Sequence, residues 1–312
     1  MDPSQAKSRD QLKDQNPLDP AVLDRLSGLA LVARTVVEGL LSGHHRSPLR
    51  GSSAEFAQHR QYVVGDELRR LDWKVFAKTD RLVVKEYFEE TTLDCHVLVD
   101  ASESMGYGSL GWTKLDYARW CAAALAHLVV AQRDTVGLVV FDEKERAKVP
   151  PGNGAEQLAA VISQLEQARA QGATGVGAVL GWIASRLKRR GLVVIFSDFF
   201  DEPEQIGKGL EQLRHAGHEP ILFQIVDPLE KSFDIDHLVR FDGLEGTGQK
   251  RLDPRAIRSA YQEEFARHAR ELEARSRGLG RDFVQVDTSR TVDVVLSTYL
   301  TGRNAKVRLG GR

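Results

Sequence analysis

Short apolar runs alternate with longer amphipathic stretches along most of the chain after about residue 92. Runs of about four to seven apolar residues predict buried strands, whereas apolar positions spaced three and four apart predict helices. Strands that alternate with helices indicate a mainly parallel sheet covered on both faces. The expected strands are 95–100, 135–141, 147–149 (an edge strand ending at two prolines), 192–197, 220–226 and 282–286. The expected helices are 114–131, 155–170, 176–187, 204–215, 255–277 and 292–300, the first of them capped by Thr113 with Asp116.

The first 92 residues are patterned differently. Residues 21–41 predict one amphipathic helix, because charged side chains interrupt an otherwise apolar segment. Residues 60–73 mix aromatic and charged side chains around a turn, and 81–90 predict a strand. We therefore expect four parts: a disordered tail (1–18), an N-terminal helix with a mixed region (19–92), an α/β domain (93–301) and a basic tail (302–312).

Composition narrows the classes of function. Charged residues make up 28 % of the 312 residues and the formal net charge is −1, so no global field favours nucleic acid or an anionic membrane. No apolar stretch reaches about 18 residues, and the first 20 residues do not resemble a signal peptide. Cys95 and Cys121 lack metal-site spacing and are expected to be buried free thiols. We expect a soluble cytoplasmic protein with no membrane span.

The strand at 95–100 ends in the most informative motif of the chain. Asp100, Ser102 and Ser104 follow one another at alternate positions and should project from an exposed loop. Such hard oxygen ligands suit Mg²⁺ or a similar cation. Neutral hydroxyls would leave the cation electron-poor and able to accept an anionic ligand, which favours carboxylate docking over catalysis.

Two further loops carry oxygen ligands. Thr174 lies in the glycine-rich segment 172–177, and Asp198 follows the apolar run 192–197. Ligands collect at the carboxyl ends of strands in open parallel sheets, so Asp100 and Asp198 should meet if their strands are neighbours. The alternative is that Asp100 caps a helix, Thr174 lies in an ordinary turn and Asp198 starts a loop.

This order of motifs resembles the metal-ion-dependent adhesion site of von Willebrand factor A domains. The resemblance implies a doubly wound α/β fold of that type. It also implies that Ser102, Ser104 and Thr174 ligate Mg²⁺, or another divalent ion such as Mn²⁺ or Ca²⁺, while Asp100 and Asp198 hold its water ligands. Gly175 is a departure, because these domains often have a polar residue there.

A second motif precedes the first. Arg50-Gly51, Glu55-Phe56 and the run from Arg60 to Trp73 are similar to the domain of unknown function 58 family, whose members carry an A-like domain. Members are commonly encoded beside MoxR-type AAA+ ATPases, so the resemblance implies such an ATPase, or its client, as the partner. It implies no established reaction.

Residues 60–73 have two interpretations. Arg60, Asp66, Arg69 and Asp72 could form a buried ion-pair network that staples the N-terminal region to the sheet, with Tyr62 and Trp73 packed beneath. The alternative is a partner surface. We expect the structural interpretation to hold.

The sequence thus predicts a non-enzymatic, metal-dependent protein-binding module without catalytic residues. One alternative is a Mg²⁺-dependent phosphohydrolase, but such enzymes need a second carboxylate two residues after the nucleophile, and Ser102 stands there. The other is a structural A-like domain without metal. No phosphate-binding loop is found in the required strand-to-helix context, so nucleotide binding is not expected.

Overall fold

The computed structural model describes residues 20–24, 26, 28–42, 56–63, 66, 71–87, 94–235, 239–242, 249–252, 254–278, 282–293 and 297. Contacts divide the chain into two compact units: Met1–Arg46 with Leu93–Arg312, and Ser47–Thr92. The N-terminal helices therefore group with the sheet domain. The expected tails (1–18 and 302–312) and most of the expected helix 292–300 lie outside the described residues.

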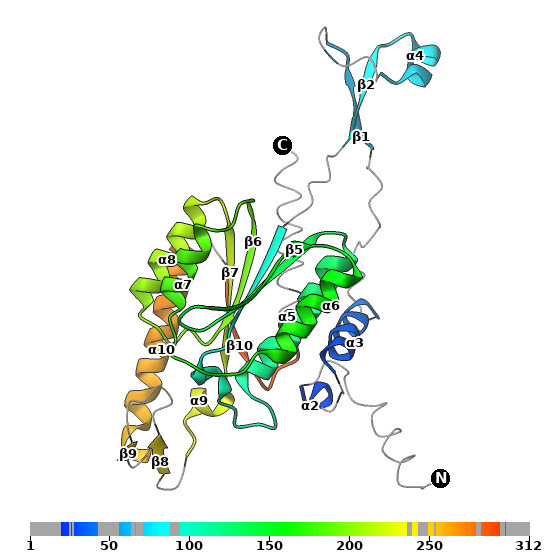
Figure 1. Cartoon of the computed structure of the whole chain (residues 1–312). Coiled ribbons are helices and arrows are strands. Elements are labelled where there is room, and N and C mark those ends of the chain that lie inside the picture. The colour runs from blue at the N-terminus through cyan, green and yellow to red at the C-terminus, as the bar shows by residue number, and fades with distance from the viewer. Residues whose placement is uncertain are drawn as a thin grey trace, which may run out of the picture. The chain divides into compact units, whose positions relative to one another are not determined.

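A six-stranded sheet forms the centre of the larger unit, with the strand order β10-β7-β6-β3-β4-β5 (Figure 1). Every neighbouring pair is parallel except β4 and β5, so the prediction of a mainly parallel sheet is confirmed. The strands are β3 (Asp94–Asp100), β4 (Thr135–Phe141), β5 (Glu145–Gly152), β6 (Gly191–Ser197), β7 (Glu219–Val226) and β10 (Asp282–Asp287).

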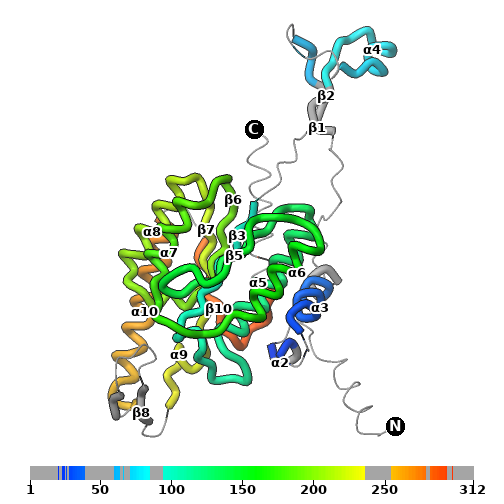
Figure 2. The backbone as a smooth tube through the Cα atoms, viewed as in Figure 1, coloured from blue at the N-terminus to red at the C-terminus, as the bar shows by residue number. Residues whose placement is uncertain are grey.

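Helices cover both faces of this sheet, as the alternating pattern predicts (Figures 1 and 2). Along β3, Cys95, Val97 and Val99 enter one core cluster, and Leu98 enters the other. The first cluster also holds buried residues of α3 (Leu29–Ser42), α5 (Lys114–Ala131) and α6 (Ala155–Gln167). The second holds residues of α7 (Val176–Ala184), α8 (Pro203–His215) and α10 (Pro254–Gly278). The central strand is therefore buried on both sides.

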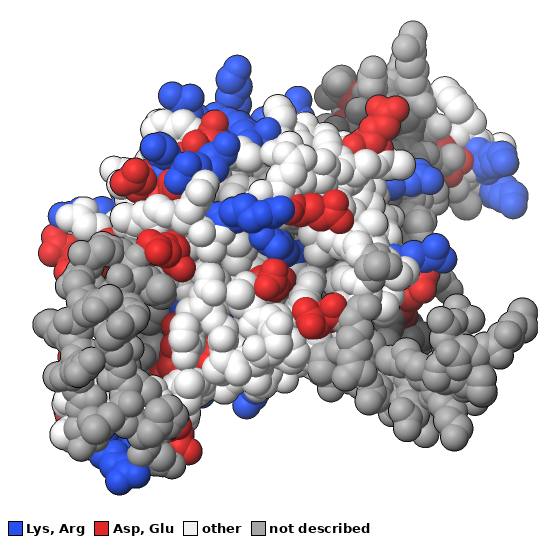
Figure 3. Space-filling view, turned by 60° about the horizontal axis from the view of Figure 1, so that its bottom comes forward, with Lys and Arg blue, Asp and Glu red and all other residues white. Residues whose placement is uncertain are grey.

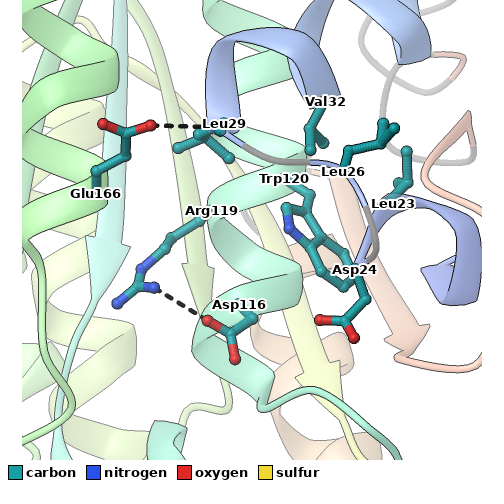
Figure 4. Close-up of a pocket in the computed structure, with 10 residues that line it drawn as sticks. Leu23, Asp24, Leu26, Leu29, Val32, Asp116, Arg119, Trp120 and Glu166 are labelled. Atoms are coloured by element: carbon teal, nitrogen blue, oxygen red, sulfur yellow. Dashed lines mark hydrogen bonds and ion pairs between the residues drawn. The ribbon is translucent and has the colours of Figure 1, made fainter. Parts of the chain in front are cut away.

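The helix expected at 21–41 is two helices, α2 (Pro20–Leu23) and α3. Gly28 stands directly before α3 and has a φ of 95°, a left-handed conformation that glycine adopts without strain. The backbone N–H of Leu29 then donates to Glu166 Oε1 at 3.1 Å, so a carboxylate from α6 binds the start of α3. A cavity of ≈ 240 Å³ lies beside this junction and is lined in part by Trp120 and Arg119 of α5 (Figure 4).

Other boundaries differ in smaller ways. The α6 helix ends at Gln167 and α7 ends at Ala184, each three residues before the expected end. Strand β5 continues through Pro150 and Pro151 to Gly152, because an antiparallel edge strand can leave proline nitrogens unpaired. The α5 boundaries and the Thr113–Asp116 capping box are confirmed. The additional elements are η2 (Glu103–Gly106), α9 (Pro228–Ser232), β8 (Val239–Asp242) and β9 (Gln249–Leu252).

The smaller unit contains an antiparallel pair, β1 (Phe56–Gln61) and β2 (Val83–Tyr87), and the helix α4 (Trp73–Thr79). Arg60 pairs with Asp66 at 2.8 Å, but both side chains are partly exposed, and Trp73 is exposed. Asp72 is buried and caps α4 by accepting from the N–H groups of Lys74 and Val75. The expectations that Arg60 and Asp66 are buried and that Trp73 packs beneath them are therefore wrong, whereas the network as a whole stays a prediction. Arg69 lies outside the described residues.

Two further expectations concern the larger unit and the chain as a whole. Cys95 and Cys121 are both buried, and neither forms a disulfide, as predicted. Within the described ranges, no helix combines the length and the apolar character needed to cross a bilayer.

Candidate metal centre

Asp100 ends β3 at the carboxyl edge of the sheet, beside β6. The two strands are parallel, and the pairing of Val99 with Phe196 places Ser197 at the same level as Asp100. Ser197 Oγ donates to Asp100 Oδ2 at 2.6 Å, and the backbone N–H of Ser102 donates to Oδ1 at 2.9 Å. Both oxygens of this fully buried carboxylate are therefore held in place. The sequence did not single out Ser197, although its position before a strand-terminal aspartate was a usable signal.

Ser102 and Ser104 face each other in the loop that follows. Their hydroxyl oxygens lie 3.1 Å apart, and both residues are buried. The expectation of exposed side chains is wrong, because residues 103–106 wind into the 3-10 helix η2, which buries Met105 and draws both serines inward. Adjacent ligands of an octahedral ion with bonds of about 2.1 Å lie about 3.0 Å apart. The spacing of the two hydroxyls therefore fits such an ion.

The glycine-rich loop adjoins this serine loop. The N–H of Gln171 donates to the Ala101 carbonyl, and the N–H of Glu103 donates to the Gly172 carbonyl, each at 2.9 Å. Gly172 has a φ of 82°, and a Cβ there would lie 2.5 Å from Asp142 Oδ2, so only glycine fits. Thr174 is half-buried and stands two residues beyond this junction.

Asp198 comes directly after β6 and is paired with a lysine. Lys114 Nζ lies 2.8 Å from Asp198 Oδ2 and 2.6 Å from Glu230 Oε1, and the lysine side chain has no exposed surface. Lys114 is the first residue of α5, where the helix dipole disfavours a cation. The sequence prediction did not include Lys114, although a lysine at this unfavourable position was a usable signal. Glu230 belongs to the capping box of α9.

Burial dominates the electrostatics of the site. Burial, and then the nearby Asp198, raise the pKa of Asp100 to about 7, although hydrogen bonds from Ser197 and Ser102 act in the opposite direction. Burial also raises the pKa of Glu230. For Lys114 burial acts against the charged form, but Asp198 and Glu230 outweigh it and raise the pKa to about 12. Three carboxylates against one ammonium give a formal charge of −2 when all are ionised, which a divalent cation would neutralise.

Phe199, directly after Asp198, has a strained backbone conformation. Its φ is 56°, an uncommon conformation for a bulky residue, and its side chain is fully buried. Its N–H donates to Ser197 Oγ at 2.8 Å, and its carbonyl accepts from His268 Nε2 at 2.9 Å. Backbone strain of this kind collects at functional sites. The turn buries Phe199 and leaves the next residue, Phe200, at the surface.

The donor chemistry also restricts the kind of metal. Within the described part of the chain, no three His, Cys, Asp or Glu side chains are grouped so as to hold a metal ion. A zinc-type site is therefore not formed by these residues. Hydroxyls and the water ligands of a hard cation fit the groups present.

The larger unit is a von Willebrand factor A-like domain. The features that define this class are the strand order, the antiparallel edge strand, the helices on both faces and the DxSxS loop after the central strand. The chain belongs to the family described as "Protein of unknown function DUF58", whose sequence pattern matches residues 58–271. Uncharacterized protein Rv1480 of Mycobacterium tuberculosis and uncharacterized protein Mb1516 of Mycobacterium bovis are each 27 % identical to it over 277 residues. These matches cover 87 % of this chain and 86 % of theirs.

Solved structures with a related arrangement are similar in fold alone. The conserved hypothetical protein BatB from Bacteroides thetaiotaomicron has a TM-score of 0.47 and 14 % identity, covering 69 % of this chain and 99 % of that one. The SpRpn10 VWA domain has a TM-score of 0.41 and 9 % identity, covering 67 % and 95 %. Likenesses at this level carry no argument about ligands or partners.

Proposed function

We propose that this protein is a non-enzymatic binding module that docks a carboxylate of a partner protein through a Mg²⁺-type ion. Ser102, Ser104 and Thr174 would ligate the ion, and Asp100 and Asp198 would orient its water ligands. The observation that carries the proposal is the buried pair of serine hydroxyls, 3.1 Å apart, beside a buried carboxylate.

Charge supports a divalent cation at this place. When Asp100 is ionised, the four groups Asp100, Asp198, Glu230 and Lys114 carry a surplus of −2 in largely buried surroundings, where uncompensated charge is costly. The hydroxyl ligands add no negative charge of their own. The bound ion would therefore have neutral direct protein ligands and could still accept a partner's carboxylate as a further ligand.

Hydrolytic chemistry has less support. Both oxygens of Asp100 already accept hydrogen bonds, and Ser102, which stands where a phosphohydrolase needs its second carboxylate, is paired with Ser104. A hydroxyl with an ordinary pKa does not act as a general acid or base near neutral pH. We therefore propose no catalytic residues.

The partner class comes from the resemblance to the family. We infer that a MoxR-type AAA+ ATPase, or a protein on which such an ATPase acts, supplies the carboxylate in the cytoplasm. The ATPase would bring the nucleotide chemistry, since no phosphate-binding loop is recognised in this sequence.

Calorimetric titration of the purified protein with MgCl₂ tests the proposal. Saturable binding to the wild type and none to Ser102→Ala/Ser104→Ala would support it, with Mn²⁺ and Ca²⁺ titrations comparing the metals. Equal or absent heats for the two proteins would favour the metal-free alternative. Hydrolysis of p-nitrophenyl phosphate that is lost in Asp100→Ala would favour the phosphohydrolase.

A further inference from the structure

Four aromatic side chains form a continuous row beside the candidate metal centre, which we call the aromatic row: Phe200, Phe265, Tyr261 and Phe233. The ring centroids of Phe200 and Phe265 are 6.3 Å apart, those of Phe265 and Tyr261 6.0 Å, and those of Tyr261 and Phe233 4.2 Å. The row starts in the loop after β6, follows α10 and ends just after α9. Phe233 is buried, Phe265 and Tyr261 are half-buried, and Phe200 is 40 % exposed.

The exposed end of the row is attached to the candidate metal centre. The N–H of Phe200 donates to Asp198 Oδ1 at 3.3 Å. Lys114 Nζ, which pairs with Asp198, lies 5.0 Å from the Phe200 ring centroid. His268 stacks near the same ring, with centroids 6.4 Å apart, and bonds to the Phe199 carbonyl. Phe200 is therefore fixed on several sides although much of it faces solvent.

A fixed, exposed aromatic ring is a good anchor for a partner. Binding energy in protein interfaces concentrates on aromatic residues, and little entropy is lost when such a residue is already held in place. The strained turn at Phe199 keeps Phe200 outward, although a relaxed backbone would avoid the conformation. Figure 3 shows the molecule with the bottom of Figure 1 turned forward, where uncharged residues surround scattered Lys, Arg, Asp and Glu side chains.

We propose that the recognised segment is a short acidic–apolar peptide of the partner, whose Asp or Glu reaches the ion while a large apolar side chain packs on Phe200 and Phe265. This inference rests on the proposed function and adds the feature by which the site would select among partner segments. Carboxylates are common on protein surfaces, so the ion alone selects poorly, whereas the aromatic row rejects segments without an apolar residue nearby.

Phe200 adjoins the candidate metal centre through its hydrogen bond to Asp198, so distances along the row indicate how far the apolar residue of the peptide can stand from the carboxylate. An extended peptide advances about 3.3 Å per residue. The steps of 6.3 and 6.0 Å from Phe200 to Phe265 and on to Tyr261 therefore correspond to roughly two residues each. The apolar residue should stand about one to four positions from the carboxylate.

A phage-displayed library of random peptides, selected on the immobilised full chain in MgCl₂ and separately in EDTA, tests this inference. We expect the MgCl₂ selection to enrich peptides with an acidic residue and a large apolar residue at this spacing. In fluorescence polarisation with one enriched peptide, Phe200→Ala should weaken binding about tenfold or more, and Phe200→Leu should weaken it less. Leu31→Ala is the matched control, since Leu31 is 45 % exposed on α3, and it should change binding less than twofold.

The outcomes separate this inference from the proposed function. Acidic peptides without an apolar preference, or affinity unchanged by Phe200→Ala in a protein with wild-type circular dichroism, would overturn the role of the aromatic row and leave the metal site standing. Apolar peptides enriched equally in MgCl₂ and EDTA would overturn both the inference and the proposed function. Failure to enrich any peptide would also count against the aromatic row.

Discussion

Lys114 and Asp198 form an ion pair that is closed to solvent: Nζ lies 2.8 Å from Oδ2, and the two side chains are 0 % and 1 % exposed. The pair joins the start of α5 to the end of β6, and Glu230 extends it to α9. The candidate metal centre is thereby tied to three elements that are far apart in the sequence.

Removing the ammonium should destabilise the fold. Lys114→Met leaves the buried Asp198 and the partly exposed Glu230 without their cation, and breaking a buried pair costs roughly 3–5 kcal/mol. Urea unfolding in EDTA measures this loss. MgCl₂ should stabilise Lys114→Met more than the wild type, because the variant carries one more uncompensated negative charge. A loss below about 1 kcal/mol would contradict a structural role for the pair.

Replacing the two serines one at a time should change stability differently from replacing both. Ser102→Ala or Ser104→Ala alone leaves one buried hydroxyl without its partner and should cost about 1–3 kcal/mol. The double variant removes both groups and should cost no more than the worse single variant, since loss of both partners is closer to neutral. Unfolding in EDTA checks this order. Additive losses would show that the hydroxyls do not depend on each other.

Asp100 should give the metal-free protein a distinctive dependence on pH. Its pKa is raised from 3.8 to about 7, so between about pH 4 and pH 7 the folded state holds a proton that the unfolded state has released. The contribution of this group to stability is therefore complete below about pH 4 and falls as pH rises through 7. Asp100→Asn should remove that decline. The difference in unfolding free energy between variant and wild type, measured in EDTA from pH 5 to pH 8, should grow with pH, and a constant difference would contradict the shifted pKa.

His96 should act in the opposite direction. The side chain is buried and makes a T-shaped contact with His218, with the ring centroids 6.1 Å apart. Burial is the main cause, and the charge of His218 the second, that lowers the pKa of His96 from 6.5 to about 4. The unfolded state therefore binds a proton first as pH falls, so stability present above about pH 6.5 is lost toward pH 4. His96→Phe should reduce this loss, as measured by urea unfolding at pH 5 and pH 7. If the variant and the wild type lose the same unfolding free energy between pH 7 and pH 5, His96 titrates normally.

The fold was largely predictable because its signals are local. The apolar runs and the Thr113–Asp116 cap fixed the helix at 114–131, and six strands were expected near their observed places. The break between α2 and α3 was missed because the apolar pattern continues through it, although Gly28, directly before α3, was a usable signal. The pair β8–β9 was missed because its strands are only four residues long.

The candidate site was predictable only in part. Asp100, Ser102, Ser104 and Asp198 stood out because they follow buried strands. Lys114, Ser197 and Glu230 did not, because their roles arise from contacts between residues 84 to 116 positions apart. Serine burial was mispredicted for a related reason, since the turn of η2 is not visible in an alternating motif.

Anomalous diffraction from crystals of this protein grown with MnCl₂ tests the central claim most directly. The account predicts an anomalous peak within roughly 2.5 Å of both Ser102 Oγ and Ser104 Oγ, the bonding range of hard divalent ions. The peak should be lost in crystals of Ser102→Ala/Ser104→Ala. Wild-type crystals with no peak there, and with the two hydroxyls still bonded to each other, would contradict it.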